Sequence, residues 1–338
     1  FGGILQRSPY QDYTCPMDDF LARRHDAYTT RPDEIAAVVG KVTRQPIASY
    51  EKLVRGYDNE VYVVTLHDSS RLVVRIRRHG ELPLEDEAWA IEQARATGAP
   101  VPVVYLCEHF PIDGAVRPVM VQAFVPGHPL GELAPTLRPG EVRACVVQAA
   151  QALVQVHSVR VEGWYMRRHG VWDFADGAAI AASNLEDRRS ERGAALAAGI
   201  TAGEWERLIT TLDTLQRRLP PELPVLLHGD YTPDHLLFDD ALRLAGIIDW
   251  GQSQGGTPMV DLLGLHNAGL GVPVDVEWLR AGYGAAPIWD TFAERMLAHE
   301  IGYTIGSLNH HYAIGDMVAV VGHADRLHRL AAAERLGL

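Results

Sequence analysis

The chain has 338 residues, of which 47% are apolar, and it carries a formal net charge of −12. This length and apolar content predict one large domain or two lobes around a substantial core. The acidic charge argues against a nucleic-acid surface as the main function, and no apolar run approaches the ~20 residues that cross a bilayer. The three cysteines are far apart and match no zinc spacing, which favours free thiols in a cytoplasmic protein.

The first predicted elements are a short helix and three strands. Residues 1–35 are mixed and polar, and we interpret them as an N-terminal extension. Pro32 and the two acids after it fit a helix start, and Gly40 is expected to close that helix. The pattern then takes the period of strands, separated by turn residues, at 48–54, 60–66 and 72–77.

The next segments divide the chain into a β-rich part and an α-rich part. A helix is predicted over 84–97, and two more strands over 100–106 and 116–124, so residues 36–125 form a five-stranded sheet with one helix. Residues 126–338 are expected to be mostly helical, with short strands at LLHGD, HLLFD and AGIID. A small β-rich part followed by a large α-rich part indicates an α+β protein.

Two acids stand at the ends of apolar runs in the second part. Residues 227–239 read LHGDYTPDHLLFD, and residues 245–256 read AGIIDWGQSQGG. A hairpin between HLLFD and LAGIID would bring Asp230 and Asp249 together at the open end of the hairpin. Phosphoryl transfer needs a carboxylate base and hard oxygen ligands for Mg²⁺, so Asp230 would be the base and Asp249 the metal ligand. The alternative is that both acids cap backbone N–H groups in turns.

The second stretch also contains a G-x-S-x-G pattern, which is typical of serine hydrolases. Ser253 would be the nucleophile, with a later acid and histidine such as Asp290 and His323. Against this, Pro258 and few helix formers follow where the elbow needs a helix, and no repeated βαβ units precede it. A P-loop is absent from the sequence, and HEIGY at 299–303 ends in tyrosine where a zinc protease needs histidine.

The paired motifs resemble those of a known family. HGD-x4-[N/H] followed by [I/V]-[I/V]-D-W is similar to the pattern of the aminoglycoside phosphotransferase-like kinases, which include choline, homoserine, fructosamine and macrolide kinases. The resemblance extends over about residues 50–265. It implies a protein-kinase-like fold with two lobes, the smaller with an antiparallel sheet and one helix and the larger mostly α-helical. It also implies ATP or GTP and Mg²⁺ as cofactors, with a catalytic loop at 228–235 and a metal-binding segment at 249–251.

The resemblance also assigns roles to residues of the larger lobe. Asp230 corresponds to the catalytic base and Asp249 to the Mg²⁺ ligand. His228 corresponds to a residue that orients the backbone of the loop, and Asp261 to an acid that braces the loop from the following helix. His235 stands where the family most often has asparagine. Macrolide phosphotransferases resemble this chain in having histidine at that position. Imidazole is a softer ligand than an amide oxygen and must be neutral to bind metal, so we hypothesise that His235 supports the metal directly or through water.

In the smaller lobe, the resemblance points to phosphate contacts. Gly56 and Asn59 match a G-x-x-N turn that covers the phosphates. Arg75 falls where protein kinases have the lysine of V-A-I-K, although Arg77 on the same strand face is a second candidate. Glu87, on the next helix, would pair with the arginine. The alternative for Glu87 is a solvated helix face, because two other acids flank it.

The remaining assignments concern the nucleotide base and the acceptor. Backbone groups from Gln122 to Phe124 match the hinge that reads the adenine edge. The acceptor would be a hydroxyl of a small molecule, such as an aminoglycoside, a macrolide or a metabolite, and antibiotic resistance is one expected role. A nucleotide-binding pseudokinase or scaffold is the main alternative. Nucleic-acid and membrane partners are not expected, and the sequence does not indicate an oligomeric state.

Overall fold

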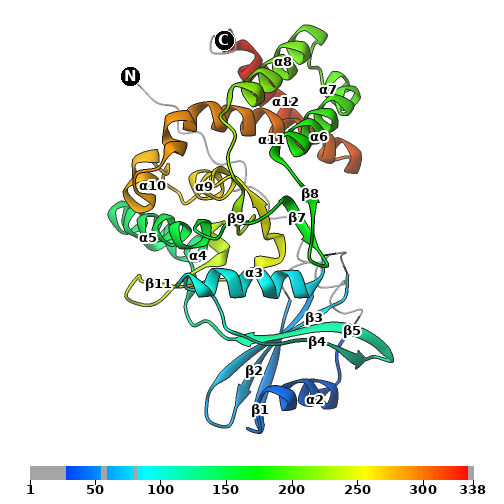
Figure 1. The fold of residues 1–338 in the computed structure, drawn as a ribbon, viewed down its shortest axis with the longest axis vertical. Helices are drawn as coiled ribbons and strands as arrows, with labels where there is room; N and C mark the ends of the chain where they lie inside the picture. The colour runs from blue at the N-terminus through cyan, green and yellow to red at the C-terminus, as the bar shows by residue number, and fades with distance from the viewer. Residues whose placement is uncertain (1–27, 55–58, 80–81, 334–338) are drawn as a thin grey trace.

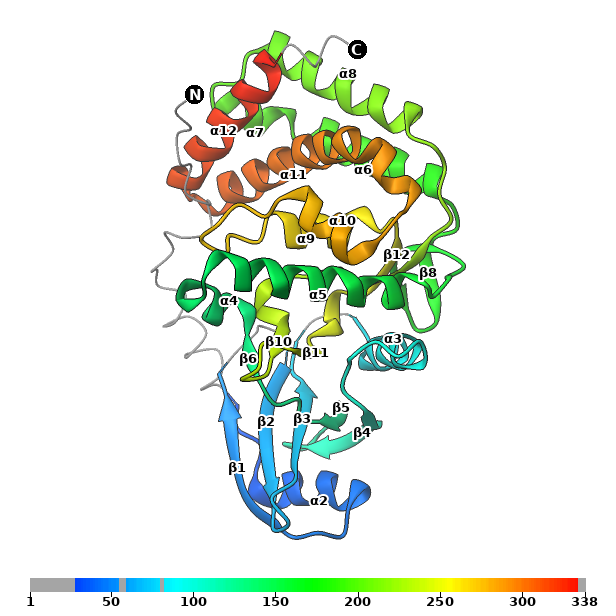
Figure 2. The ribbon, with the colours of Figure 1, turned by 90° about the vertical axis from the view of Figure 1, so that its left-hand side faces the viewer.

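The computed structural model describes residues 28–54, 59–79 and 82–333, and it has two lobes joined near residue 124 (Figures 1 and 2). The smaller lobe contains a five-stranded antiparallel sheet with strand order β1-β2-β3-β5-β4. Its strands are β1 (Ile47–Leu53), β2 (Asn59–Leu66), β3 (Arg71–Arg77), β4 (Val104–Ile112) and β5 (Ala115–Ala123). The predicted α+β fold with two unequal lobes is confirmed.

Two helices lie on the sheet of the smaller lobe. Helix α2 (Pro32–Val42) packs Ile35, Val38 and Val39 into the apolar face of the sheet. It continues through Gly40, so the predicted stop at that glycine is wrong, and the predicted extension to residue 35 overlaps this helix. Helix α3 (Leu84–Ala96) instead shares its buried apolar side chains with the core of the larger lobe. Figure 2 shows α3 between the sheet and α5.

The larger lobe is mostly helical. Its helices are α4 (Leu130–Leu133), α5 (Pro139–His157), α6 (Gly177–Ser190), α7 (Arg192–Ala197), α8 (Ala202–Arg218), α9 (Met259–His266), α10 (Val276–Tyr283), α11 (Phe292–Ile314) and α12 (Met317–Ala332). Single 3₁₀ turns are η1 (Ala134–Thr136), η2 (Pro233–His235), η3 (Trp250–Gln252) and η4 (Pro287–Thr291). Among the residues described, no helix is both long and apolar enough to cross a bilayer.

Two small sheets support the paired motifs. One has the order β11-β10-β6 and the other β8-β7-β12-β9. Their strands are β6 (His128–Pro129), β7 (Trp164–Arg168), β8 (Val171–Phe174), β9 (Val225–Leu227), β10 (Leu236–Phe238), β11 (Leu244–Ile247) and β12 (Gln254–Gly256). The hairpin predicted between HLLFD and LAGIID is present as β10 and β11. Strands β7, β8 and β12 were not predicted from the sequence.

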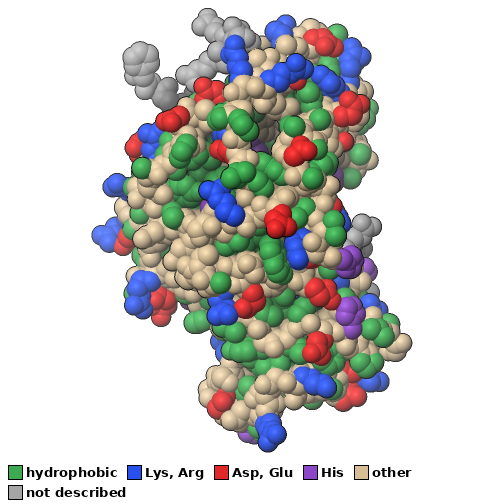
Figure 3. All heavy atoms as spheres, in the orientation of Figure 1, with side chains coloured by type: hydrophobic (Ala, Val, Ile, Leu, Met, Phe, Trp, Pro, Cys, Tyr) green, Lys and Arg blue, Asp and Glu red, His purple; other side chains and the backbone are tan. Residues whose placement is uncertain are grey.

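The surface carries its net negative charge without segregation on the face shown in Figure 3. Basic and acidic side chains are interspersed there along both lobes. Ion pairs one helical turn apart in the sequence include Arg95 with Glu92 and Arg217 with Asp213. Such exposed pairs stabilise a protein by less than about 1 kcal/mol each, so the stability of the fold rests on its buried groups.

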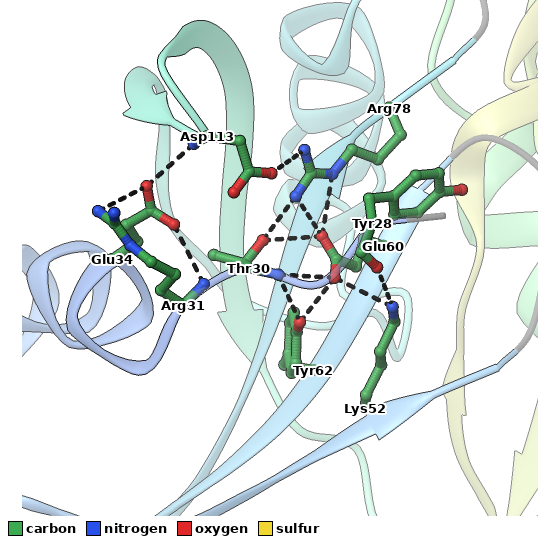
Figure 4. A network of polar contacts seen from close by, with 9 residues as sticks. All are labelled: Tyr28, Thr30, Arg31, Glu34, Lys52, Glu60, Tyr62, Arg78 and Asp113. Atoms are coloured by element: carbon green, nitrogen blue, oxygen red, sulfur yellow. Dashed lines mark hydrogen bonds and ion pairs between the residues drawn. The ribbon is translucent and has the colours of Figure 1, made fainter. Parts of the chain in front are cut away.

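One of these buried groups is Glu60, whose side chain is fully buried on β2. Its carboxylate accepts hydrogen bonds from the Thr30 backbone N–H at 3.0 Å, from the Tyr62 hydroxyl at 2.6 Å and from Arg78 Nη2 at 2.6 Å (Figure 4). Lys52 Nζ lies 3.2 Å away. Because Thr30 precedes α2, this cluster fastens the chain ahead of that helix to the centre of the sheet.

This cluster predicts how stability depends on pH. Burial by itself raises the pKa of Glu60, but the hydrogen bonds from Tyr62, Thr30 and Arg78 outweigh it and lower the pKa from 4.5 to about 2. An acid whose folded-state pKa is depressed stabilises the fold above its unfolded pKa, and this contribution is lost as the pH falls through the folded value. In urea unfolding, the stability advantage of the wild type over Glu60→Gln should be full above pH 4.5 and shrink towards pH 2. An advantage that does not change with pH would contradict the assignment.

Candidate active site

The loop after β9 is held by one buried carboxylate. Asp261 on α9 is fully buried, and its two oxygens accept the backbone N–H groups of His228 and Gly229 at 2.8 and 2.9 Å. His157, at the end of α5, donates to Asp261 from Nε2 at 3.1 Å. Burial raises the pKa of Asp261, but these donors outweigh it and the net shift is downward, so the carboxylate stays charged. This bracing matches the role that the family resemblance implies for Asp261.

The turn at Gly229 has room only for glycine. Its φ is +81°, and a Cβ there would lie 1.9 Å from the carbonyl oxygen of Gln252. Residues with a side chain avoid this backbone region and could not accept that contact. The loop carrying Asp230 therefore lies directly against the segment that follows Asp249.

His228 links the same two segments from inside the protein. Its Nε2 donates to the carbonyl of Ile248 at 2.9 Å, and its Nδ1 accepts the backbone N–H of Asp230 at 3.3 Å. Burial lowers the pKa of His228, which favours the neutral ring that these two bonds require. The ring also packs edge-on against buried Trp250 at 4.9 Å between centroids. The tryptophan of the D-W motif thus fixes the histidine of the H-G-D motif.

His235 lies between the two candidate carboxylates. Its Nδ1 is 3.6 Å from Asp230 Oδ2, and its Nε2 is 3.6 Å from Asp249 Oδ2. Nδ1 also lies 2.9 Å from the backbone carbonyl of Asp230, to which it must donate. That tautomer leaves a lone pair on Nε2 on the side of Asp249. The carboxylates of Asp230 and Asp249 are about half exposed, at 45% and 50%, so ligands can reach them.

The smaller lobe contributes Arg75 to this cluster. Arg75 on β3 is buried and forms an ion pair with Glu87 on α3, and its Nη2 lies 3.4 Å from Asp249 Oδ1. Arg77 approaches Glu87 at 3.9 Å. Burial disfavours charge on Arg75, but Glu87 and Asp249 outweigh this and raise its pKa. Glu87 is only 3% exposed, so it does not lie on a solvated helix face.

Arg75 in turn affects Asp249. Burial raises the pKa of Asp249, whereas the charges of Arg75, His235 and His228 lower it, and the net shift is downward. Asp249 also has a left-handed backbone, with φ +61°. Such a conformation is uncommon outside glycine, asparagine and aspartate. It turns the chain sharply at the mouth of the β10–β11 hairpin, where the ionised carboxylate lies beside Arg75.

The structure describes three of the four other residues that were predicted to contact the nucleotide. Gly56 lies outside the described residues. Asn59 begins β2 opposite Arg77. Gln122 lies on β5, which runs between β3 and β4, and its side chain is buried. The backbone N–H of Phe124 donates to Arg71 at 3.3 Å, so the structure does not leave this donor free for an adenine edge.

The serine elbow is not formed. Ser253 lies between the 3₁₀ turn η3 and the short strand β12, so no helix begins behind it. Strand β12 is antiparallel to both of its neighbours. A nucleophile elbow needs a strand, a sharp turn and a helix in a mostly parallel sheet, and the described residues do not provide this arrangement.

Comparison with known proteins agrees with the motif pair. A family model described as "Phosphotransferase enzyme family" matches residues 49–295, which cover parts of both lobes and include the candidate site residues above. The chain belongs to this family. It is therefore a small-molecule phosphotransferase, as the motifs predicted. No curated protein matches its sequence.

Solved structures show that the fold of this phosphotransferase is shared at low sequence identity. A thermostable mutant of aminoglycoside phosphotransferase APH(4)-Ia, in complex with ADP and hygromycin B, has a TM-score of 0.63 and 12% identity, covering 89% of this chain and 98% of its own. The gentamicin complex of APH(2″)-IIa has a TM-score of 0.59 and 16% identity, covering 89% and 97%. A candidate fructosamine-3-kinase from Thermobifida fusca has a TM-score of 0.58 and 18% identity, covering 88% and 100%.

Sequence reasoning missed two residues of the candidate site. His157 is 104 positions away from Asp261 and ends an amphipathic helix, so no local pattern marks it as a loop brace. Trp250 was noted only as part of the D-W motif, and its contact with His228 depends on the tertiary fold. A histidine on the apolar face of the last helical turn is the one available signal for His157.

Asp261→Asn tests whether this carboxylate holds the loop. An asparagine would set an amide N–H₂ against backbone N–H donors, so we expect a loss of about 1–3 kcal/mol in unfolding free energy and a fall in turnover. The fully exposed Asp240→Asn is the matched control and should change neither quantity. Wild-type stability and turnover in Asp261→Asn would contradict the bracing role.

Proposed function

We propose that this phosphotransferase transfers the γ-phosphate of ATP to a hydroxyl group of a small molecule, with Asp230 as the catalytic base. The observation that carries the proposal is the spacing of Asp230, His235 and Asp249, each 3.6 Å from the next. A base and a metal ligand separated by one side chain fit an acceptor and a nucleotide triphosphate that meet in one cleft. Arg75 supports the same proposal, because its positive charge can stabilise phosphate oxygens.

Asp230 would accept the proton of the acceptor hydroxyl. Its carboxylate is 45% exposed, so an acceptor can approach it. Its backbone is fixed by His228, and the neighbouring Gly229 is fixed by Asp261. A positioned general base contributes about 10²–10⁴-fold to the rate. Because the backbone is held at both Gly229 and Asp230, the carboxylate would be positioned before an acceptor binds.

The donor set at Asp249 fits Mg²⁺. Among the described residues, no group of three or more His, Cys, Asp or Glu is placed to hold a metal alone. Mg²⁺ suits this, because it is usually bound by one or two carboxylates, phosphate oxygens and water. Asp249 would be the carboxylate ligand, and His235 Nε2 would support the metal directly or through water. When bound, the ion would neutralise negative charge on the phosphates.

Arg75, oriented by Glu87, would hold the nucleotide phosphates from the smaller lobe. Arg75 is already paired with Glu87 and lies next to Asp249, so its guanidinium is oriented before any ligand binds. Arginine offers a planar, permanently charged set of donors to phosphate oxygens. The adenine edge would be read by the backbone close to β5. Asn59, at the start of β2, would lie over the phosphates.

The acceptor is a small molecule that the larger lobe would bind, and the structure leaves its class open. Aminoglycosides, macrolides and metabolite alcohols are the candidates, and a substrate screen that identifies an antibiotic as acceptor would assign a role in antibiotic resistance. The ATP-dependent chemistry fits a cytoplasmic enzyme. The alternative is a nucleotide-binding pseudokinase. The presence of both Asp230 and Asp249 favours the enzyme.

Asp230→Asn separates the enzyme from a binder. The wild type should consume ATP when offered the correct acceptor from panels of antibiotics and metabolites. Asp230→Asn should lose about 10²–10⁴-fold in turnover and still bind Mg·ATP in titration calorimetry. Asp234→Asn, an exposed acid in the same loop, is the matched control. ATP binding without turnover in the wild type across the panels would favour the pseudokinase, and full activity in Asp230→Asn would remove it as the base.

His235→Asn tests the metal contact. An amide oxygen is a harder ligand than imidazole. Imidazole binds later transition metals better than it binds Mg²⁺. The ratio of turnover with Co²⁺ to turnover with Mg²⁺ should therefore fall in His235→Asn relative to the wild type. His128→Asn, which changes an exposed histidine in β6, should leave that ratio unchanged. The same metal ratio in the wild type and His235→Asn would exclude His235 from the metal site.

A further inference from the structure

A β-hairpin of the larger lobe is hydrogen-bonded to the helix that carries Glu87. Strands β7 and β8 pair antiparallel, and the pair Arg168 and Val171 closes a two-residue turn, His169–Gly170. Both turn residues have positive φ, +50° and +85°. That combination is typical of a type I′ turn, whose twist matches the strands. The backbone N–H groups of the two turn residues lie outside the strand pairing.

Both of these N–H groups end on Asp86. Its carboxylate accepts the N–H of His169 at 2.5 Å and that of Gly170 at 3.1 Å, and Arg167 Nη1 forms an ion pair with it. Asp86 is buried, although its neighbour Glu85 is exposed. All three donors come from the hairpin, whereas Asp86 lies on α3. The contact therefore joins a helix at the base of the smaller lobe to a strand pair of the larger lobe.

A second contact lies one helical turn further along α3. The guanidinium of Arg167 stacks over the ring of Trp89 at 4.3 Å, and Trp89 meets Trp172 edge-on at 6.0 Å. Residues three apart on a helix share a face, so Asp86 and Trp89 present one surface to the hairpin. Trp172 packs between this helix and Gly255 of β12, where an added Cβ would lie 3.1 Å from its ring.

The hairpin is tied to both catalytic segments. Strand β7 pairs with β12 through Met166 and Gln254, and β12 pairs with β9 through Gln254 and Leu227. Strand β12 begins five residues after Asp249, and β9 ends three residues before Asp230. A single four-stranded sheet thus connects the helix of Glu87 with the segments of Asp249 and Asp230.

We propose that Asp86 is a positioning residue for the phosphate-binding arginine. Adjacent residues on a helix point about 100° apart, so fixing Asp86 against the hairpin fixes the rotation of α3 and directs Glu87 to Arg75. Arg167 and the His169–Gly170 turn hold Asp86 in this orientation. The inference rests on the proposed role of Arg75 with nucleotide. Asp86 itself does not touch Arg75 or the carboxylates of the site, and it acts through Glu87.

The test compares Asp86→Asn and Arg167→Met with two matched controls, Glu85→Gln on the same helix and Arg168→Met on the same hairpin. Amide hydrogen exchange over residues 84–96 should rise in both test variants and stay at the wild-type level in both controls. This readout does not depend on activity. Unchanged exchange in Asp86→Asn and Arg167→Met would overturn the proposal, even if the phosphotransferase reaction is confirmed.

The kinetic arm asks whether Asp86 acts through Glu87. Removing a hydrogen-bonded charge should lower kcat/KM for ATP about tenfold or more, with little change in KM for the acceptor, and Asp86→Glu should recover part of the loss. Asp86→Asn combined with Glu87→Gln should be no worse than Glu87→Gln alone. Additive losses would overturn the positioning role. If the wild type transfers no phosphate, the proposed function fails, and the exchange result still decides whether the hairpin holds α3.

Discussion

The antiparallel pairing of β10 with β11 is the constraint on which the site depends. Leu236 lies opposite Ile247, and the N–H of Ile248 donates to the carbonyl of His235 at 2.9 Å. The chain leaves His235, turns within a few residues and returns, so the next residue after Ile248 must lie beside the histidine. Asp249 is that residue. Without this register, its carboxylate and that of Asp230 would have no reason to lie within reach of one ligand, because a slip of one residue moves every side chain to the opposite face.

An ion pair between Arg75 and Asp249 also joins the two lobes. Arg75 brings a buried positive charge from the smaller lobe to Asp249, and Glu87 stabilises that charge where water cannot. A buried cation is tolerated only when it is paired, so α3 must stay close to β3. The apolar side chains of α3 belong to the core of the larger lobe, and Asp86 is bonded to the β7–β8 hairpin. Arg75 and Glu87 are consequently supported by the same β-strands that support the loop of Asp230.

The sequence predicts the parts of this structure that are encoded locally. Alternating residues and turn signals mark the strands of the smaller lobe, and the spacing of apolar residues around Asp230 and Asp249 marks the hairpin. The errors arise where distant residues decide. Helix α2 passes Gly40 because Val38, Val39 and Val42 pack against the sheet. Strands β7 and β12 were missed because QGG has no strand pattern until β7 and β9 flank it. Nothing in the local run EDE at 85–87 indicates that its last two acids face inward to arginines on different lobes.

The most direct test of the account is a crystal structure with Mg²⁺ and a non-hydrolysable ATP analogue. The account predicts that the metal contacts a carboxylate oxygen of Asp249 at about 2.0–2.1 Å, that Arg75 contacts phosphate oxygens and that the terminal phosphate faces Asp230. A nucleotide bound elsewhere, or a metal held without Asp249, would contradict the claim that the β10–β11 hairpin assembles a single phosphoryl-transfer site.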